Sequence, residues 1–114
     1  YVVYGDFASG AGLKEGDAVE IAGVKVGKVE SIALADDLAR IGLRINPGVK
    51  LQDDVIASVR ARGLIGDKFI LISLGASDRI LNHRGKIRET ESPPDLIDMI
   101  GTLVSGDLTS SDKK

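Results

Sequence analysis

The side chains of this 114-residue chain that could do chemistry are few and scattered. His83 is the only histidine and lies in the turn-like stretch LNHRGK, so we expect it at the surface. Asp36-Asp37 and Asp53-Asp54 are adjacent pairs at predicted turns, where successive side chains point apart, and we interpret both pairs as turn formers. The chain has no cysteine, which excludes a thiolate metal site and a disulfide framework.

No motif in the chain predicts catalysis. Its serines and aspartates lack the second base that a nucleophilic triad requires. The stretch GVKVG at 23–27 is typical of a strand and lacks the helix start that a phosphate-binding loop needs. The sequence therefore predicts a protein that is not an enzyme and that carries no cofactor and no metal.

Charge is unevenly distributed, although the formal net charge is only −2. Segment 58–88 contains two acidic residues, Asp67 and Asp78, whereas the segment from Glu89 onward is acidic until the last two lysines. Two interpretations remain open: solvated strand faces, or a basic surface for phosphate headgroups or a partner. The basic residues of the segment are Arg60, Arg62, Lys68, Arg79, Arg84, Lys86 and Arg88.

Short segments with alternating apolar and polar residues predict that the fold is mainly β. In 38–45, for example, every second residue is apolar, while Arg40 and Arg44 share the opposite face. The nearly wholly apolar 69–74 is typical of a strand buried on both faces, and a phase slip beside Gly27 predicts a bulge or bend. Six or seven strands at this spacing favour a small antiparallel barrel or sandwich. The predicted strands are 1–7, 18–22, 24–34, 38–45, 54–62, 69–74 and 85–90.

The apolar period changes to that of a helix after residue 91. Ser92 is a candidate N-cap, and two prolines begin the segment. We therefore divide the chain into a barrel domain (1–91), a C-terminal amphipathic helix (92–105) and a polar tail predicted to be disordered (106–114). The helix either caps the barrel or offers its stripe to an oligomer or ligand. The stripe consists of Leu96, Ile97, Ile100, Leu103 and Val104.

The stretch RARGLIGDKF at 60–69 places two large aliphatic residues in a predicted turn. Leu64 and Ile65 stand between Gly63 and Gly66, although turns favour small or polar residues. From the residues alone, the pair is best interpreted as a plug that folds back over the barrel end.

Three stretches after Phe7 form a recognisable pattern: GLKEGDAV (12–19), IAGVKVGKVESIAL (21–34) and DDVIASVRARGLIGDKFILISLG (53–75). Their most specific parts are G-V-x-V-G-x-V at 23–29 and G-L-I-G-[DE]-x-[FY] at 63–69. In order and spacing these stretches resemble the mammalian cell entry (MCE) domain, and the MlaD type in particular. The resemblance runs from Tyr1 to about Val104.

The resemblance implies a fold and a function. Domains of this family are seven-stranded barrels that assemble as homo-hexameric rings around a central pore, through which phospholipid passes between membranes. By position, Gly63, Leu64, Ile65 and Gly66 would line the pore, and the helix from about Pro94 to Val104 would continue the apolar channel. With this resemblance, the pore interpretation of Leu64 and Ile65 replaces the plug.

The resemblance also implies partners and a location. The partners would be an inner-membrane ABC permease with its ATPase and a periplasmic lipid-binding protein, with no nucleic acid. The domain would face the periplasm, anchored to the inner membrane by an N-terminal transmembrane helix outside this sequence.

An alternative comes from 16–32, which is loosely similar to the KOW element of small barrels that bind nucleic acid or ribosomes. That function favours basic charge and exposed aromatic residues, and this chain has a negative net charge and 4% aromatic residues.

Overall fold

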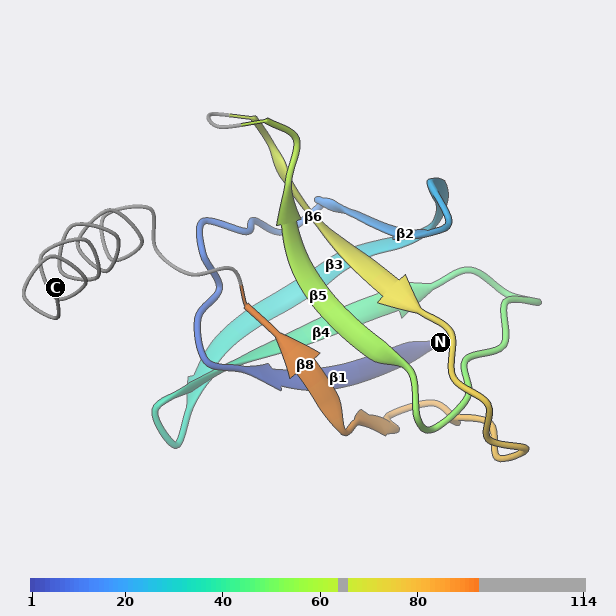
Figure 1. The fold of residues 1–114 in the computed structure, drawn as a ribbon. Coiled ribbons are helices and arrows are strands. Elements are labelled where there is room, and N and C mark those ends of the chain that lie inside the picture. The colour runs from blue at the N-terminus through green and yellow to red at the C-terminus, as the bar shows by residue number, and fades with distance from the viewer. Residues whose placement is uncertain (64–65, 93–114) are drawn as a thin grey trace, which may run out of the picture.

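One curved β-sheet makes up the fold (Figure 1). The structure is a computed structural model, and it describes residues 1–63 and 66–92. Within these residues the chain forms eight strands and no helix, so the mainly β prediction is confirmed. The strands are β1 Val2–Phe7, β2 Ala18–Ile21, β3 Val24–Ala35, β4 Leu38–Ile45, β5 Ile56–Ala61, β6 Lys68–Ser73, β7 Lys86–Ile87 and β8 Glu89–Glu91.

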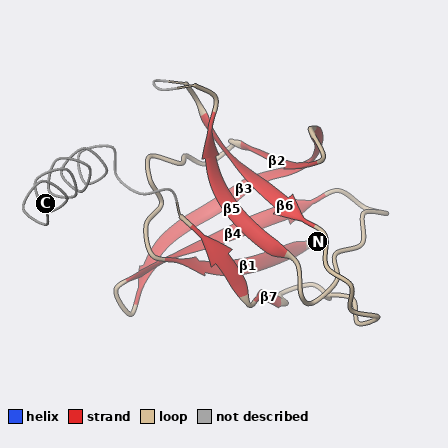
Figure 2. Ribbon diagram, in the orientation of Figure 1, coloured by secondary structure: helices blue, strands red, loops and turns tan. Residues whose placement is uncertain are grey.

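The two ends of the sheet are joined by the chain itself, which makes the sheet barrel-like. The strand order is β7-β1-β4-β3-β2-β6-β5-β8, so β7 and β8 lie at opposite ends of that order. Only Arg88 separates these two strands in the sequence. Across the closure, the Thr90 hydroxyl on β8 donates a hydrogen bond of 2.7 Å to the backbone oxygen of Asp6 on β1. Figure 1 shows β8 crossing in front of β1, and Figure 2 labels the short β7 near β1.

The prediction of seven antiparallel strands is wrong in two respects. First, the closing strand expected at 85–90 is divided at Arg88, because its halves pair with different strands, β1 and β5. Second, the sheet is mixed: β1 with β7, β2 with β6 and β5 with β8 are parallel pairs. Alternation reports which face of a strand is buried, and it carries no information about the direction of the neighbouring strand. The predicted helix at 92–105 lies outside the described residues, apart from Ser92.

The core consists of inward-facing aliphatic side chains and one aromatic ring. In β4 the alternation predicted from the sequence is confirmed, since Ile41, Leu43 and Ile45 are buried. In β6 the predicted burial on both faces is wrong, because Phe69 and Leu71 are only half-buried while their neighbours point inward. The largest fully buried side chains are Phe7, Ile41, Leu43, Ile45, Leu51, Ile70, Ile72, Ile87, Val3, Val19, Val29 and Val55.

Strand β3 is irregular on both sides of Gly27, which confirms the predicted bulge. Its pairing with β2 skips Val26, and its pairing with β4 skips Glu30. Val26 and Val29 are three positions apart, so a regular strand would place them on opposite faces, and the shift at Val26 lets both be buried. At Gly27 a β-carbon would lie 2.1 Å from the backbone oxygen of Arg44, so only glycine fits this approach of β3 to β4.

Candidate functional site

The predicted pore loop lies at the outer end of the β5–β6 hairpin, which projects from the barrel in Figure 1. The strands pair in register up to Ala61 and Lys68, and beyond them the Arg62 N–H donates a hydrogen bond of 2.9 Å to the Asp67 backbone oxygen. Gly63 and Gly66 are described, whereas Leu64 and Ile65 lie outside the described residues.

Both glycines of the loop are required by the backbone. Gly63 has a φ of 81°, in the left-handed region that side chains disfavour. At Gly66 a β-carbon would lie 1.5 Å from the backbone oxygen of Arg62, which leaves no room for any side chain. The two glycine positions of the motif therefore each have a backbone reason.

The base of the loop is fixed by one charged side chain that joins three strands. Arg62 forms an ion pair with Glu20 of β2, and its guanidinium lies 4.3 Å from the centroid of the Phe69 ring on β6. Glu20 is only 8% exposed, whereas the Arg62 side chain is 52% exposed, so only the carboxylate side of the pair is shielded from solvent. The sequence marked Arg62 only as part of a basic segment, and no local signal identified Glu20 as its partner.

The five predicted channel residues all lie outside the described residues: Leu96, Ile97, Ile100, Leu103 and Val104. The expected start of their helix, Ser92, is described. Its hydroxyl accepts a hydrogen bond from the Ser9 N–H at 3.2 Å and donates one to the Ser9 backbone oxygen at 2.9 Å. The chain that leaves β8 is therefore attached to the loop that follows β1.

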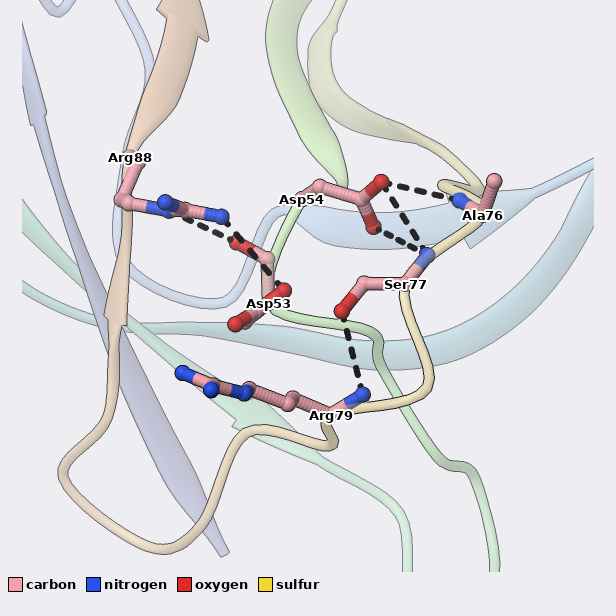
Figure 3. A network of polar contacts seen from close by, with 6 residues as sticks. All are labelled: Asp53, Asp54, Ala76, Ser77, Arg79 and Arg88. Carbon is pink, nitrogen blue, oxygen red and sulfur yellow. Dashed lines mark hydrogen bonds and ion pairs between the residues drawn. The ribbon is translucent and has the colours of Figure 1, made fainter.

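The aspartate pairs are turn formers, as the sequence predicted. Asp36 and Asp37 have φ values of 51° and 63° and form the two-residue turn between β3 and β4. The carboxylate of Asp54 accepts hydrogen bonds from the N–H groups of Ala76 at 2.9 Å and Ser77 at 3.1 Å (Figure 3). These bonds lower the pKa of Asp54. Both pairs therefore shape loops.

Asp53 points away from Asp54 and toward the joint between β7 and β8 (Figure 3). Arg88, at that joint, donates a hydrogen bond of 3.3 Å to the Asp53 backbone oxygen and lies 3.4 Å from Asp53 Oδ1.

His83 is exposed, as predicted, and its Nδ1 accepts a hydrogen bond of 3.1 Å from the Val2 N–H. Across residues 1–63 and 66–92, no group of three or more histidine, aspartate or glutamate side chains could hold a metal ion. Over the same ranges, no helix could cross a membrane.

A second charged cluster lies on the outer face of β1, β4 and β7. The carboxylate of Asp6, whose side chain is 12% exposed, lies 2.9 Å from Nε of Arg40 and 3.0 Å from Nζ of Lys86. The hydrogen bonds from Arg40, and then from Lys86, hold the pKa of Asp6 far below its ordinary value of 3.8. Asp6 therefore stays ionised in the folded chain under conditions where a free aspartate is protonated.

The ion pairs of Asp6 predict a pH-dependent contribution to stability. Because the pKa of Asp6 is depressed by folding, its stabilisation is complete above about pH 5 and is lost as the pH falls through the depressed pKa. We expect the wild-type chain to melt at a higher temperature than Asp6→Asn at pH 7, and the difference to shrink below pH 4. Melting curves from pH 7 to pH 2 measure it. Asp78→Asn, which removes an exposed carboxylate, is the control; a difference for Asp6→Asn that stays constant over this range contradicts the prediction.

Comparisons with known proteins agree with this geometry. The family model of the MlaD protein matches residues 1–75. The chain is 31% identical over 121 residues to the intermembrane phospholipid transport system binding protein MlaD of Escherichia coli K12, covering 99% of this chain and 66% of that protein. It is 28% identical over 116 residues to the protein of the same name from Haemophilus influenzae, covering 96% and 70%.

The fold is also found in a solved assembly. A chain of the Acinetobacter MlaFEDB complex, in its ATP-bound Vtrans1 conformation, superposes with a TM-score of 0.82 over 90% of this chain and 80% of that chain, at 20% identity. The family model spans well over half of the chain, from β1 to the end of β6, and it includes the GLIG loop. The chain belongs to the MlaD protein family.

Proposed function

We propose that the chain is a non-enzymatic subunit of a phospholipid transport system, and that six copies form a ring with a hydrophobic central pore. Its relatives from Escherichia coli and Haemophilus influenzae are named as phospholipid transport binding proteins. In this proposal Gly63, Leu64, Ile65 and Gly66 line the pore. The apolar stripe of 96–104 continues the channel.

The observation that carries the proposal is the construction of the β5–β6 hairpin end. The Arg62–Glu20 pair joins its base to β2, and the backbone requires glycine at both 63 and 66. The sequence places two aliphatic residues between these glycines, at the outer end of the hairpin. In a ring, this position would offer an apolar contact surface to a ligand.

A collar of aliphatic side chains provides what an acyl chain needs. Six copies of Leu64 and Ile65 would form a ring of twelve such side chains. Each methylene group kept out of water contributes about 0.8 kcal/mol. Movement of lipid along such a wall requires no chemistry in this chain, and we assign the energy for transport to an ATPase partner.

We place this subunit between two membranes, on the periplasmic side of the inner membrane. Its proposed partners there are an ABC permease with its ATPase and a periplasmic lipid-binding protein. The word "intermembrane" in the names of both relatives and the ATP-bound complex of the fold neighbour support this placement. The KOW-like alternative is not pursued, because 16–32, on which it rested, falls within the MlaD match.

The double variant Leu64→Asn/Ile65→Asn tests the pore. We expect it to fold with an unchanged melting temperature and to lose lipid transport in reconstituted vesicles, because amide groups in the collar disfavour acyl chains. The matched control is Leu34→Asn/Leu38→Asn, which removes two exposed leucines, 82% and 38% accessible, from the end of the β3–β4 hairpin. The control should transport lipid normally.

Two results would overturn the proposal. A large drop in melting temperature for Leu64→Asn/Ile65→Asn would show that the pair plugs the barrel. Native mass spectrometry of the wild-type chain with its partners gives the second test. We expect a hexamer that carries phospholipid, and a lipid-free monomer would contradict the proposal.

A further inference from the structure

A cationic cavity lies on the outer face of the sheet. It has a volume of about 480 Å³ and is lined by Tyr4, Arg40, Arg84 and Lys86. This volume is in the range of sites for small ligands, roughly 300–1,000 Å³. The cavity involves β1, β4 and β7, and Figure 2 shows β7 at the opposite end of the molecule from the β5–β6 hairpin end. It is therefore separate from the proposed pore loop.

Strand register brings three of the lining residues to one face. Tyr4 pairs with Lys86 across β1 and β7, and Arg40 pairs with Asp6 across β4 and β1. Residues at alternate positions on these strands, such as Phe7, Ile41 and Ile87, are buried on the other face. The lining side chains therefore project outward together.

Glycine at position 42 leaves space for the aromatic wall of the cavity. A β-carbon at Gly42 would lie 3.1 Å from Cε1 of Tyr4, so the phenol ring lies against the bare backbone of β4. The ring is half-buried there. A phenol hydroxyl is a hydrogen-bond donor for an oxyanion.

Arg84 is held at the cavity by the turn before β7. Its φ of 68° is unusual for a residue with a side chain. The Arg84 N–H donates a hydrogen bond of 2.6 Å to the Val2 backbone oxygen, and the Tyr4 N–H donates one of 2.9 Å to the Gly85 backbone oxygen. These bonds fix the turn against β1. In the part of the chain that the structure describes, no carboxylate lies within ion-pair distance of Arg84.

Asp6 organises the other two cations without neutralising the cavity. Arg40 Nη2 at 3.1 Å and Lys86 Nζ at 3.0 Å both reach Oδ2 of Asp6. The carboxylate thereby holds two groups of like charge side by side, which would otherwise repel each other. The three cations Arg40, Arg84 and Lys86, taken with Asp6, carry an excess of two positive charges. Asp36 also attracts Arg40, without forming an ion pair with it.

We propose that this cavity binds a phosphate group, in the form found in phospholipid headgroups. A phosphate offers several oxygens in different directions, which suits two guanidinium groups, an ammonium and a phenol on different sides of a cavity. This site would add headgroup binding to the proposed function. The choice of a lipid as the source of the phosphate rests on that function. Free phosphate has the same chemistry, so the experiment distinguishes the two sources.

Titration of the whole chain tests the site. Two-dimensional NMR follows the Arg40 and Arg84 side-chain Nε–H signals while sn-glycerol 3-phosphate, inorganic phosphate or glycerol is added at constant ionic strength. We expect saturable shifts with both phosphates and none with glycerol. Arg84→Asn should weaken binding roughly tenfold, as expected for loss of a charge-assisted contact. Asparagine tolerates the left-handed backbone of position 84, so this variant should fold.

Arg60→Asn is the matched control, because Arg60 is an exposed arginine on β5, outside the cavity lining. It removes the same charge and should leave binding unchanged. Equal weakening by Arg60→Asn and Arg84→Asn would overturn the site and indicate only non-specific attraction to a basic surface. The absence of saturable shifts in the wild-type chain would also overturn it.

Vesicles identify the source of the phosphate. Binding to phosphatidylglycerol vesicles that glycerol 3-phosphate displaces, and that Arg84→Asn weakens, supports a lipid headgroup. Binding of the free phosphates without vesicle binding overturns the lipid source. The Leu64→Asn/Ile65→Asn variant should bind phosphate normally, so failure of the pore and failure of this site give different results.

Discussion

Replacing Gly27 with alanine is expected to destabilise the barrel by about 3 kcal/mol or more, the upper range for overpacking a tight site. The added β-carbon would lie 2.1 Å from the backbone oxygen of Arg44 and 3.1 Å from the Cα of Ile45. Both are backbone atoms, so no side-chain rotation relieves the clash, and β3 must separate from β4. Typical domains have only about 5–15 kcal/mol in total, so the change consumes a large fraction of the stability.

Urea unfolding of Gly27→Ala measures this loss, with Gly10→Ala as the control. A β-carbon at Gly10 would have no atom within 4 Å, and the φ of Gly10 is not positive, so the same substitution should be almost neutral there. Equal stability of the two variants would mean that β3 and β4 do not approach as closely as the structure has them.

Replacing Phe7 with alanine is expected to cost about 3–5 kcal/mol, the usual range for a buried aromatic side chain. Phe7 is fully buried at the end of β1, where β8 closes the barrel. Its ring and the Thr90 methyl group both lie close to the space above Gly5. Loss of the ring therefore leaves a cavity in the core and removes support from the closure.

Phe7→Leu tests whether the loss of stability comes from the missing side-chain volume or from any substitution at this position of β1. Leucine refills much of the cavity, so this variant should recover most of the stability in the same urea measurement. Phe69→Ala, at a half-buried position of β6, should cost less than Phe7→Ala. A smaller loss for Phe7→Ala than for Phe69→Ala would contradict the position of Phe7 in the core.

The parts of the fold that depend on residues close together in the sequence were predictable. Alternation located the strands and the inward face of β4, and the phase slip located the bulge at Gly27. The direction of strand pairing was not predictable, because it depends on which strands meet after folding. The division of 85–90 at Arg88 has the same origin, since each half pairs with a strand far away in the sequence.

The site could be predicted only where it is local. The glycines of the GLIG loop were identified from a short motif, and the structure supplies their backbone reasons. The partner of Arg62 and the cluster around Asp6 could not be found in this way. Glu20 lies 42 residues from Arg62, and Asp6 lies 34 residues from Arg40, so only the strand register brings them together.

The joint at Arg88 also sets an order on folding during synthesis. Until Lys86–Glu91 has left the ribosome, β1 lacks its β7 neighbour and β5 lacks its β8 neighbour, so both present unpaired backbone groups. Such edges can pair with other chains, which is the usual route to aggregation of a partly made β protein. The nascent chain therefore stays vulnerable until nearly all of the sequence of residues 1–91 is available.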